Sequence, residues 1–268
     1  MPRARPKNPS ATGERSMLQP ENKRAITREQ FDAVLFDLDG VITDTASLHA
    51  VCWKQMFDEY LQKRAIHRGD RFQPFDIATD YALYVDGKPR FDGVRDFLAS
   101  RNIRLPEGSL DDPGQTETVR GLGNRKNDLI NRLINDVGVK PYEGSVKLIS
   151  ELRERGFKIA VVTSSQNCDV VLRAANLDAV FEVRVDGHMI HGQQLAGKPA
   201  PDTFLMAAKL LGVDPTRAVV IEDAIAGVQA GFNGNFGLVI GVARMGNADE
   251  LRSHGAHLVV NDLDELVD

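Results

Sequence analysis

Two aspartates separated by one residue stand where a short apolar run ends. The run Ala33 to Phe36 stops at Asp37, and Asp39 and Gly40 follow directly. In an extended chain, side chains two positions apart point to the same side, so both carboxylates face one place. Such a pair can divide the roles of nucleophile and general acid/base, or it can bind a hard cation. The alternative is a solvated Asp-Gly turn, which this motif alone does not exclude.

A second acidic pair, Glu222 and Asp223, ends the later apolar run 218–221. Taken alone, two acids at such a position are an ordinary device at the start of a helix. Together with Asp37 and Asp39 they form an oxygen-rich set, and oxygen ligands point to Mg²⁺ rather than to zinc.

Hydroxyl and ammonium groups stand at comparable places. Thr163, Ser164 and Ser165 follow the apolar run 158–162, and their hydroxyl and amide groups could hold a phosphate oxygen. A helix cap is an equal alternative for these three residues. Lys198 precedes a Pro-Ala-Pro segment just before a helical pattern, where its ammonium could neutralise a phosphoryl group. Considered alone, it would be interpreted as a surface lysine.

The apolar runs in front of these residues predict parallel strands. Runs 33–36, 158–162, 218–221 and 237–242 are continuously apolar rather than alternating, which is typical of strands covered on both faces. Between them lie helical patterns that Gly156 and Gly212 close. This alternation predicts an α/β fold with a Rossmann-like, doubly wound parallel sheet. Ligands of such sheets bind at the carboxyl ends of the strands, where the polar residues above stand.

The segment between the first two predicted strands is too long for a simple crossover. Helical patterns near residues 49–63 and 125–136 flank a long polar middle, and residues 105–118 are rich in Pro, Gly and acids. A segment of this length predicts a second domain. We therefore expect the chain to be divided into a disordered tail over residues 1–27, a core over 28–46 and 141–268, and an inserted, mostly helical cap domain over 47–140.

Composition limits the class of protein. The 268 residues are 42% hydrophobic and 26% charged, as in ordinary globular chains. The net charge of −5 argues against non-specific nucleic-acid binding, which needs a basic face. No window approaches the ~18–20 consecutive apolar residues that a membrane helix needs. Cys52 and Cys168 are the only cysteines, too few for a four-cysteine zinc site, so we expect reduced thiols and a cytoplasmic location.

The first 25 residues are basic and contain no apolar segment of the kind that a secretory signal has. Arg3, Arg5, Lys7 and Arg15 could contact an anionic partner, but a solvated tail is the expected interpretation.

The order of these motifs resembles the haloacid dehalogenase superfamily. The string Phe-Asp-Leu-Asp-Gly-Val-Ile-Thr-Asp-Thr at residues 36–45 is similar to its first motif. Thr163 is similar to the second motif, Lys198 to the third, and the pair Glu222-Asp223 to the fourth. The second motif carries a threonine where the related mutases have serine, and the hydroxyl is kept.

Within that superfamily the chain resembles the β-phosphoglucomutase family. His49 and Trp53 downstream of the first motif match its pattern, as do Arg125-Lys126-Asn127 and the stretch 197–202. Sugar-phosphate phosphatases share most of these features. The resemblance covers nearly everything from Phe31 onward.

The resemblance implies roles for the residues at these positions. Asp37 would be the nucleophile that forms an aspartyl-phosphate, and Asp39 would be the general acid/base. Mg²⁺ would be held by Asp37, by Asp39 through its backbone carbonyl and by Asp223, with Glu222 supporting the cluster. The residues that would bind the substrate or its phosphate are Thr163, Ser164, Lys198, His49, Lys126 and Arg90. For His49, Lys126 and Arg90, an ordinary polar surface position is the alternative.

The implied activity is a phosphotransfer that interconverts β-glucose 1-phosphate and glucose 6-phosphate through an aspartyl-phosphate and a bisphosphate. The alternative is a Mg²⁺-dependent hydrolase that acts on a small sugar phosphate with the same residues. A non-catalytic metabolite-binding module is a third hypothesis, which the intact set of carboxylates disfavours. The expected partners are small sugar phosphates, with no nucleic acid and no membrane, and the expected state is a monomer or at most a weak homodimer.

Overall fold

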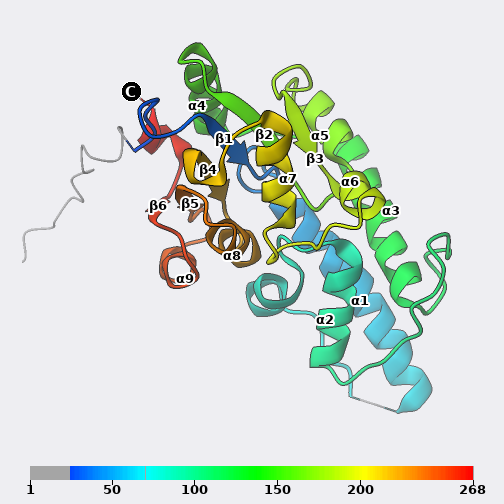
Figure 1. Cartoon of the computed structure of the whole chain (residues 1–268). Coiled ribbons are helices and arrows are strands. Elements are labelled where there is room, and N and C mark those ends of the chain that lie inside the picture. Colours follow the sequence, from blue (N-terminus) through cyan, green and yellow to red (C-terminus); the bar gives the residue numbers. More distant parts are fainter. Residues whose placement is uncertain (1–24, 70, 268) are drawn as a thin grey trace, which may run out of the picture.

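A computed structural model describes residues 25–69 and 71–267, and its centre is a sheet of six strands within those ranges (Figure 1). The strands are all parallel and lie in the order β3-β2-β1-β4-β5-β6. Their bounds are β1 Ala33–Phe36, β2 Lys158–Val162, β3 Val183–Val185, β4 Ala218–Glu222, β5 Leu238–Val242 and β6 Leu258–Val260. The predicted doubly wound parallel sheet is confirmed.

Helices cover both faces of this sheet. The helices that follow the insert are α4 Glu143–Glu154, α5 Cys168–Ala174, α6 Gly187–Gly192, α7 Asp202–Leu211, η3 Pro215–Arg217, α8 Ile225–Asn233, α9 Ala248–Ser253 and η4 Leu263–Leu266. Alternate residues of a strand point to opposite faces. Val34 and Phe36 of β1 therefore pack with α4, α5 and η4, while Ala33 and Leu35 pack with α7, α8 and α9.

The four predicted strands correspond to β1, β2, β4 and β5. The short strands at the two edges, β3 and β6, were not predicted, because three residues are too few to give a recognisable apolar run. The order of the strands places the carboxyl ends of β1, β2 and β4 side by side at the centre of the sheet.

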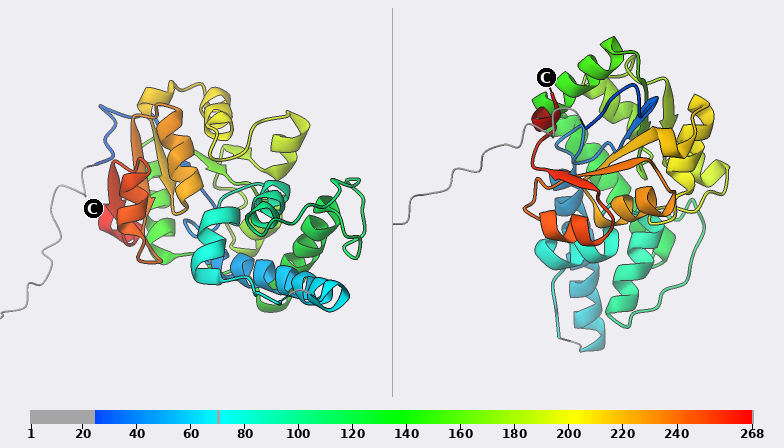
Figure 2. Two further views of the ribbon diagram at one scale, coloured as in Figure 1. Left: turned by 90° about the horizontal axis from the view of Figure 1, so that it is seen from below. Right: turned by 60° about the vertical axis from the view of Figure 1, so that its left-hand side comes forward.

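Between β1 and α4 lies a group of helices that we call the helical insert, residues 46–137. It contains α1 Ala46–Arg68, the π-helix η2 Ile77–Val85, α2 Arg90–Ser100 and α3 Val119–Val137. These helices lie to one side of the sheet, beyond the carboxyl ends of its central strands (Figures 1 and 2). The insert has its own apolar cluster, in which the ring of Phe57 contacts those of Trp53, Phe75 and Phe97.

The long polar middle expected for this region contains two helices, which corrects the sequence analysis. The structure places η2 and α2 there, and it buries Phe75, Val85, Val94, Phe97 and Leu98 in the cluster of the insert. These apolar residues are widely spaced among charged ones. The segment as a whole is therefore polar on average, and this average concealed the apolar face of its helices. The expected loop at residues 105–118 is free of regular helix or strand.

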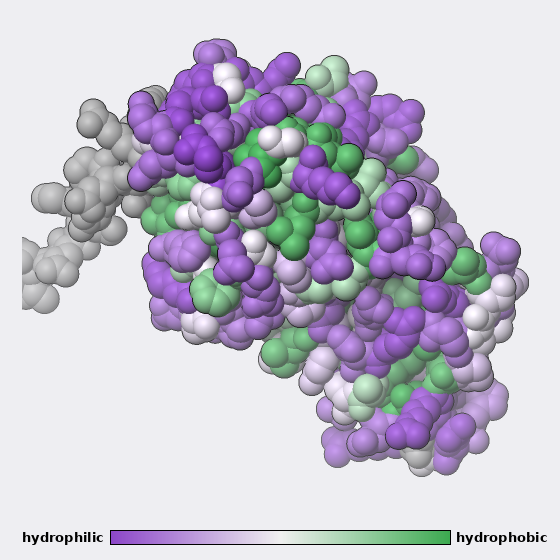
Figure 3. Space-filling model, viewed as in Figure 1, coloured by the Kyte–Doolittle hydropathy of each residue, from purple (hydrophilic) through white to green (hydrophobic). Residues whose placement is uncertain are grey.

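The predicted tail, residues 1–27, lies outside the described residues except at its last three positions. There Ile26 is buried against the core, and its carbonyl accepts a hydrogen bond of 2.6 Å from Arg155. Cys52 and Cys168 are both buried and unpaired. None of the described helices combines the length and the apolar character needed to cross a membrane. Hydrophilic residues cover most of the face seen in Figure 3.

Candidate active site

The carboxyl ends of β1, β2 and β4 face the helical insert across a cavity of about 540 Å³. Its lining includes strand-end residues of the core, among them Asp37, Asp39, Thr163 and Asp223. Residues of α1, α3 and the loop between η2 and α2 line it from the other side. The cavity is therefore shared by the core and the insert.

A buried ion-pair cluster lies at the floor of this cavity. The pairing of β1 with β4 sets Asp37 beside the end of β4, since the amide of Asp37 donates to the carbonyl of Ile221. Lys198 Nζ donates to Asp37 Oδ1 at 2.5 Å, to Glu222 Oε1 at 2.6 Å and to the carbonyl of Val162 at 3.2 Å. The ammonium of Lys198 thus joins the ends of three strands.

The charges of this cluster stabilise one another. Burial alone would lower the pKa of Lys198, but the carboxylates of Asp37 and Glu222 hold it above its usual value, so the lysine is cationic. Burial raises the pKa of Asp37 well above its usual range, and the ammonium of Lys198 acts in the opposite direction. A further positive charge at this site would favour the ionised form of Asp37.

Three acidic residues could hold a metal ion. Asp37, Glu222 and Asp223 each offer one oxygen, and these oxygens lie within 4.8 Å of one another. Gly40 makes room for this arrangement: a Cβ atom there would lie 1.8 Å from Asp223 Oδ2, and its φ of +94° is one that other residues rarely adopt. Glu222 also accepts hydrogen bonds from the backbone amides of Asp223 and Ala224. The cluster thus offers Asp37 and Asp223 as the less engaged carboxylates.

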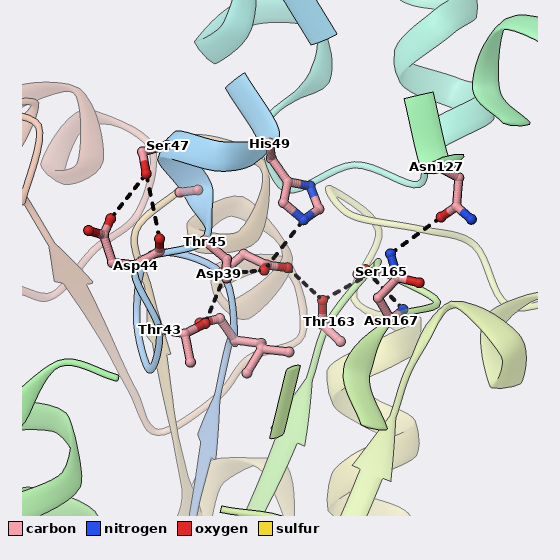
Figure 4. Close-up of polar contacts among 12 residues, drawn as sticks. Asp39, Thr43, Asp44, Thr45, Ser47, His49, Asn127, Thr163, Ser165 and Asn167 are labelled. Atoms are coloured by element: carbon pink, nitrogen blue, oxygen red, sulfur yellow. Dashed lines mark hydrogen bonds and ion pairs between the residues drawn. The ribbon is translucent and has the colours of Figure 1, made fainter. Parts of the chain in front are cut away.

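The side chain of Asp39 lies beside His49 of the insert (Figure 4), and Asp39 is not part of the acidic group formed by Asp37, Glu222 and Asp223. Its Oδ1 accepts a hydrogen bond from Thr45, which lies just before α1, and its Oδ2 accepts one of 3.3 Å from Thr163 at the end of β2. His49 Nε2 of α1 lies 3.6 Å from the same Oδ1. Asp37 and Asp39 therefore meet different partners although they are two residues apart.

His49 and Lys126 form a chain that leads to Asp39. Lys126 Nζ lies 2.8 Å from His49 Nδ1 and 5.0 Å from the centre of the Trp53 ring. An ammonium is a donor only, so Nδ1 is the acceptor and the proton of the neutral imidazole resides on Nε2, which faces Asp39. Burial and the charge of Lys126 lower the pKa of His49 to about 4, which keeps the ring neutral.

Lys126 is itself perturbed by its position. It is 5% exposed on α3, and burial lowers the pKa of its ammonium to about 8. The structure thus brings His49 and Lys126 into the cavity, whereas an ordinary charged helix face would leave them in solvent.

Two hydrogen bonds join the core to the insert beside the cavity. Ser164 Oγ donates to the carbonyl of Gly87 at 2.7 Å. Asn167 Nδ2 donates to Asn127 Oδ1 at 3.4 Å, as Figure 4 shows. Ser164 was predicted to contact phosphate, and here its hydroxyl contacts the loop of the insert. These bonds hold the insert against the end of β2.

Arg90 lies at the insert side of the cavity, at the start of α2. One guanidinium nitrogen donates to Asn124 Oδ1 at 3.2 Å, and the group stacks 4.7 Å from the centre of the Phe91 ring. Arg120 stacks on the same ring at 4.1 Å. Arg90 Nε is buried without a hydrogen-bond partner, so this end of the cavity is positively charged and has an unused donor.

Sequence reasoning missed Asp86 and Tyr81. Asp86 and Tyr81 both line the cavity, and the Tyr81 hydroxyl donates to the carbonyl of Ala46 at 3.3 Å. Burial, together with the nearby charges of Glu222 and Asp39, raises the pKa of Asp86 to about 7 against the lowering effect of the Tyr81 hydrogen bond. The Asp86-Gly87 pair was visible in the sequence, but nothing there placed it opposite the strand ends.

Comparison with known proteins identifies a family for this chain. The sequence profile of the haloacid dehalogenase-like hydrolases matches residues 31–235. The chain belongs to the haloacid dehalogenase-like hydrolase family. It is an enzyme of this superfamily.

Several relatives are close enough to be informative. A β-phosphoglucomutase of Mycobacterium bovis is 54% identical over 89% of this chain and 92% of its own length. A fructose-1-phosphate phosphatase of Escherichia coli is 30% identical over 75% of this chain and 92% of its own. A crystal structure of β-phosphoglucomutase from Clostridium difficile superposes with a TM-score of 0.67 and 28% identity, over 88% of this chain and 93% of that one.

Proposed function

We propose that this enzyme is a β-phosphoglucomutase, which interconverts β-glucose 1-phosphate and glucose 6-phosphate through a bisphosphate. The observation that carries the proposal is the contact of Asp39 with His49. Because His49 belongs to the insert, a movement of the insert would change the surroundings of Asp39, the proposed proton-transfer group. The 54% identity to the mycobacterial relative of that name supports the same activity.

Asp37 is the proposed nucleophile. One of its oxygens attacks the phosphorus of the bisphosphate, the bond from phosphorus to the sugar oxygen breaks, and Asp39 gives the leaving oxygen its proton. Lys198 lies 2.5 Å from Asp37 and stabilises the negative charge that spreads over the phosphoryl oxygens. Thr163 at the end of β2 donates its hydroxyl proton to Asp39 in the structure, and we propose that this hydroxyl turns to a phosphoryl oxygen when the substrate binds.

The second half-reaction reverses these roles. Asp39 takes the proton of the sugar 6-hydroxyl, whose oxygen attacks the phosphorus on Asp37 and releases the carboxylate. The sugar then carries two phosphates, and after it reorients, its first phosphate passes to Asp37. Glucose 6-phosphate is left as the product. Arg90, with its unused Nε, is proposed to hold the phosphate that is not being transferred.

The acidic cluster fits a divalent cation, and Mg²⁺ is the one we propose. All of its donors are carboxylate oxygens, the class that Mg²⁺ prefers, and Gly40 leaves the space that Asp223 needs. Asp37 and Asp223 would hold the ion, joined by the backbone carbonyl of Asp39, with Glu222 fixing Lys198 beside them. Bound there, Mg²⁺ supplies positive charge to the transferring phosphoryl group.

The helical insert is proposed to act as a cap that excludes water. An aspartyl-phosphate that must return its phosphate to a sugar survives only if water reaches it slowly. The bonds from Ser164 to Gly87 and from Asn167 to Asn127 join the insert to the core beside the cavity, which supports this role. His49 and Lys126 lie on the insert, so opening it removes them from Asp39 and from the substrate.

A sugar-phosphate hydrolase is the second candidate function. The E. coli relative named as a fructose-1-phosphate phosphatase matches most of this chain, and hydrolysis would need the same strand-end residues. The test is to incubate the enzyme with β-glucose 1-phosphate, Mg²⁺ and a trace of the bisphosphate, and to quantify both products. The mutase proposal requires glucose 6-phosphate in excess over inorganic phosphate, and the reverse ratio would favour the hydrolase.

The lowered pKa of Lys126 gives a pH prediction. The ammonium is charged below about pH 8 and neutral above it, so the capture of an anionic substrate weakens as the pH rises. We expect kcat/KM to fall by about tenfold per pH unit above that value, because kcat/KM reports the free enzyme. The measurement is a profile of kcat/KM from about pH 6.5 to about pH 9.5 at saturating Mg²⁺.

The matched control for this profile is Lys126→Arg, whose guanidinium stays charged throughout the range. The alkaline limb should be absent in that variant even if its overall rate is lower. A limb of the same midpoint in Lys126→Arg would assign the titration to another group.

The wider setting is part of the same proposal. The net charge of −5 and the sugar-phosphate chemistry of the site support small phosphorylated sugars as partners rather than nucleic acids. A cytoplasmic location fits two buried free thiols. We propose that the enzyme acts as a monomer or at most as a weak homodimer.

A further inference from the structure

The proposed reaction leaves one acidic group of the cavity without a task. Asp86 and Asp92 both line the cavity from the insert, and Asp92 pairs with Arg95. No lysine or arginine of the described residues lies within ion-pair distance of Asp86. It faces the strand ends from the loop that follows η2, and Ser164 holds the carbonyl of the next residue, Gly87, at 2.7 Å.

The π-helix fixes the position of the Asp86 backbone. The amide of Asp86 donates to the carbonyl of Tyr81 at 3.0 Å, five residues earlier, which sets the two side chains one π-turn apart. The hydroxyl of Tyr81 donates to the carbonyl of Ala46 at the start of α1 at 3.3 Å, and its proximity lowers the pKa of Asp86. Wide turns of this kind occur often at functional sites.

The charges around Asp86 make its position costly. The negative charges of Glu222 and Asp39 raise the pKa of Asp86, and the charge of Asp86 in turn raises the pKa of Asp223. The transferring phosphoryl group would add further negative charge. A neutral ligand that donates hydrogen bonds would offset this repulsion without bringing in another charge. Sugar hydroxyls are ligands of that class, and they accompany every proposed substrate of this site.

We infer that Asp86 is a specificity-determining residue whose carboxylate accepts a hydrogen bond from a sugar ring hydroxyl beside the transferring phosphate. The inference rests on the proposed sugar-phosphate transfer and names how that site selects its sugar. Asp86 and Tyr81 both line the cavity, so the Asp86 carboxyl is within reach of a substrate bound there. Because Asp86 belongs to the insert, it reaches the sugar only while the insert lies over the core.

The test compares β-glucose 1-phosphate with its 2-, 3- and 4-deoxy analogues in the Mg²⁺-loaded enzyme. The readout is kcat/KM, calculated from the sum of the new sugar phosphates and the inorganic phosphate that are formed. This sum measures turnover whether the enzyme is a mutase or a hydrolase. At one ring position, the wild-type enzyme should disfavour the deoxy analogue by about 10- to 100-fold, as expected for a hydrogen bond to a charged group. In Asp86→Ala that preference should fall to within about threefold.

Two further variants keep the inference falsifiable. Asp86→Asn keeps the shape of the side chain, so it should fold normally while losing part of the same preference. Asp136→Ala removes an exposed acid of α3 that is not in the cavity lining, and it should leave every ratio unchanged.

Discrimination that is the same in the wild-type enzyme and in both Asp86 variants would overturn the inference. So would a result in which Asp86→Ala raises only the Mg²⁺ concentration needed for activity, since that would make Asp86 part of the metal site. Failure of the proposed function is seen separately, as inorganic phosphate in place of glucose 6-phosphate in the wild-type reaction.

Discussion

Replacing Asp37 with Asn should lower turnover by at least ~10³-fold, as expected when a member of a catalytic unit is lost. The amide keeps the size of the side chain but cannot act as the anionic nucleophile. Lys198 contacts two carboxylates, Asp37 at 2.5 Å and Glu222 at 2.6 Å. The substitution leaves Glu222 as the remaining carboxylate of these two. Turnover is measured as glucose phosphates plus inorganic phosphate released from β-glucose 1-phosphate.

Asp32→Asn is the matched control for this substitution. Asp32 stands just before β1, at the opposite end of the strand, where it pairs with Arg217 on the surface. That variant should retain nearly the full rate, so a loss specific to Asp37→Asn reports the chemistry. An Asp37→Asn enzyme that kept most of its activity would show that another group attacks phosphorus.

Removal of divalent cations should have the second largest effect. Treatment with EDTA is expected to lower turnover by at least ~10²-fold, because the charge that a metal contributes to a phosphoryl transition state amounts to several kcal/mol. Added Mg²⁺ should restore the rate. The acidic cluster of Asp37, Glu222 and Asp223 is the physical reason, since its carboxylates repel one another without a cation.

Asp223→Asn provides a second readout of the same site. It removes one carboxylate from the cluster, so the Mg²⁺ concentration for half-maximal activity should rise while the fold is kept. Full activity in a rigorously metal-free sample, or an unchanged Mg²⁺ requirement in Asp223→Asn, would contradict the proposed metal site.

The centre of the fold could be predicted from sequence because its strands are buried on both faces. Val34, Leu35 and their neighbours in β1 are wholly buried, so the apolar run has no polar interruption until Asp37. The same holds for residues 159–162 of β2, which follow the exposed Lys158, and for residues 218–221 of β4. Parallel pairing then brings the residues that follow each run to one edge, which is why a linear reading placed Asp37, Thr163 and Glu222 near one another.

The rest depended on tertiary contacts that a linear pattern does not contain. The edge strands β3 and β6 are held by pairing to β2 and β5 rather than by length or apolarity. In the insert, the π-turn of η2 follows neither the helical nor the strand period, so Asp86 and Tyr81 gave no periodic signal. The burial of Lys126 beside His49 likewise arises from the packing of α1 on α3.

The fate of the aspartyl-phosphate tests the central proposal most directly. The enzyme is phosphorylated with ³²P-labelled glucose bisphosphate in the presence of Mg²⁺, and is then mixed rapidly with unlabelled β-glucose 1-phosphate. Labelled glucose bisphosphate and labelled inorganic phosphate are separated and counted after a single turnover. A mutase whose insert excludes water should pass most of the label to the sugar. If most of the label appears as inorganic phosphate while the sugar is saturating, the enzyme is a phosphatase and the mutase proposal is wrong.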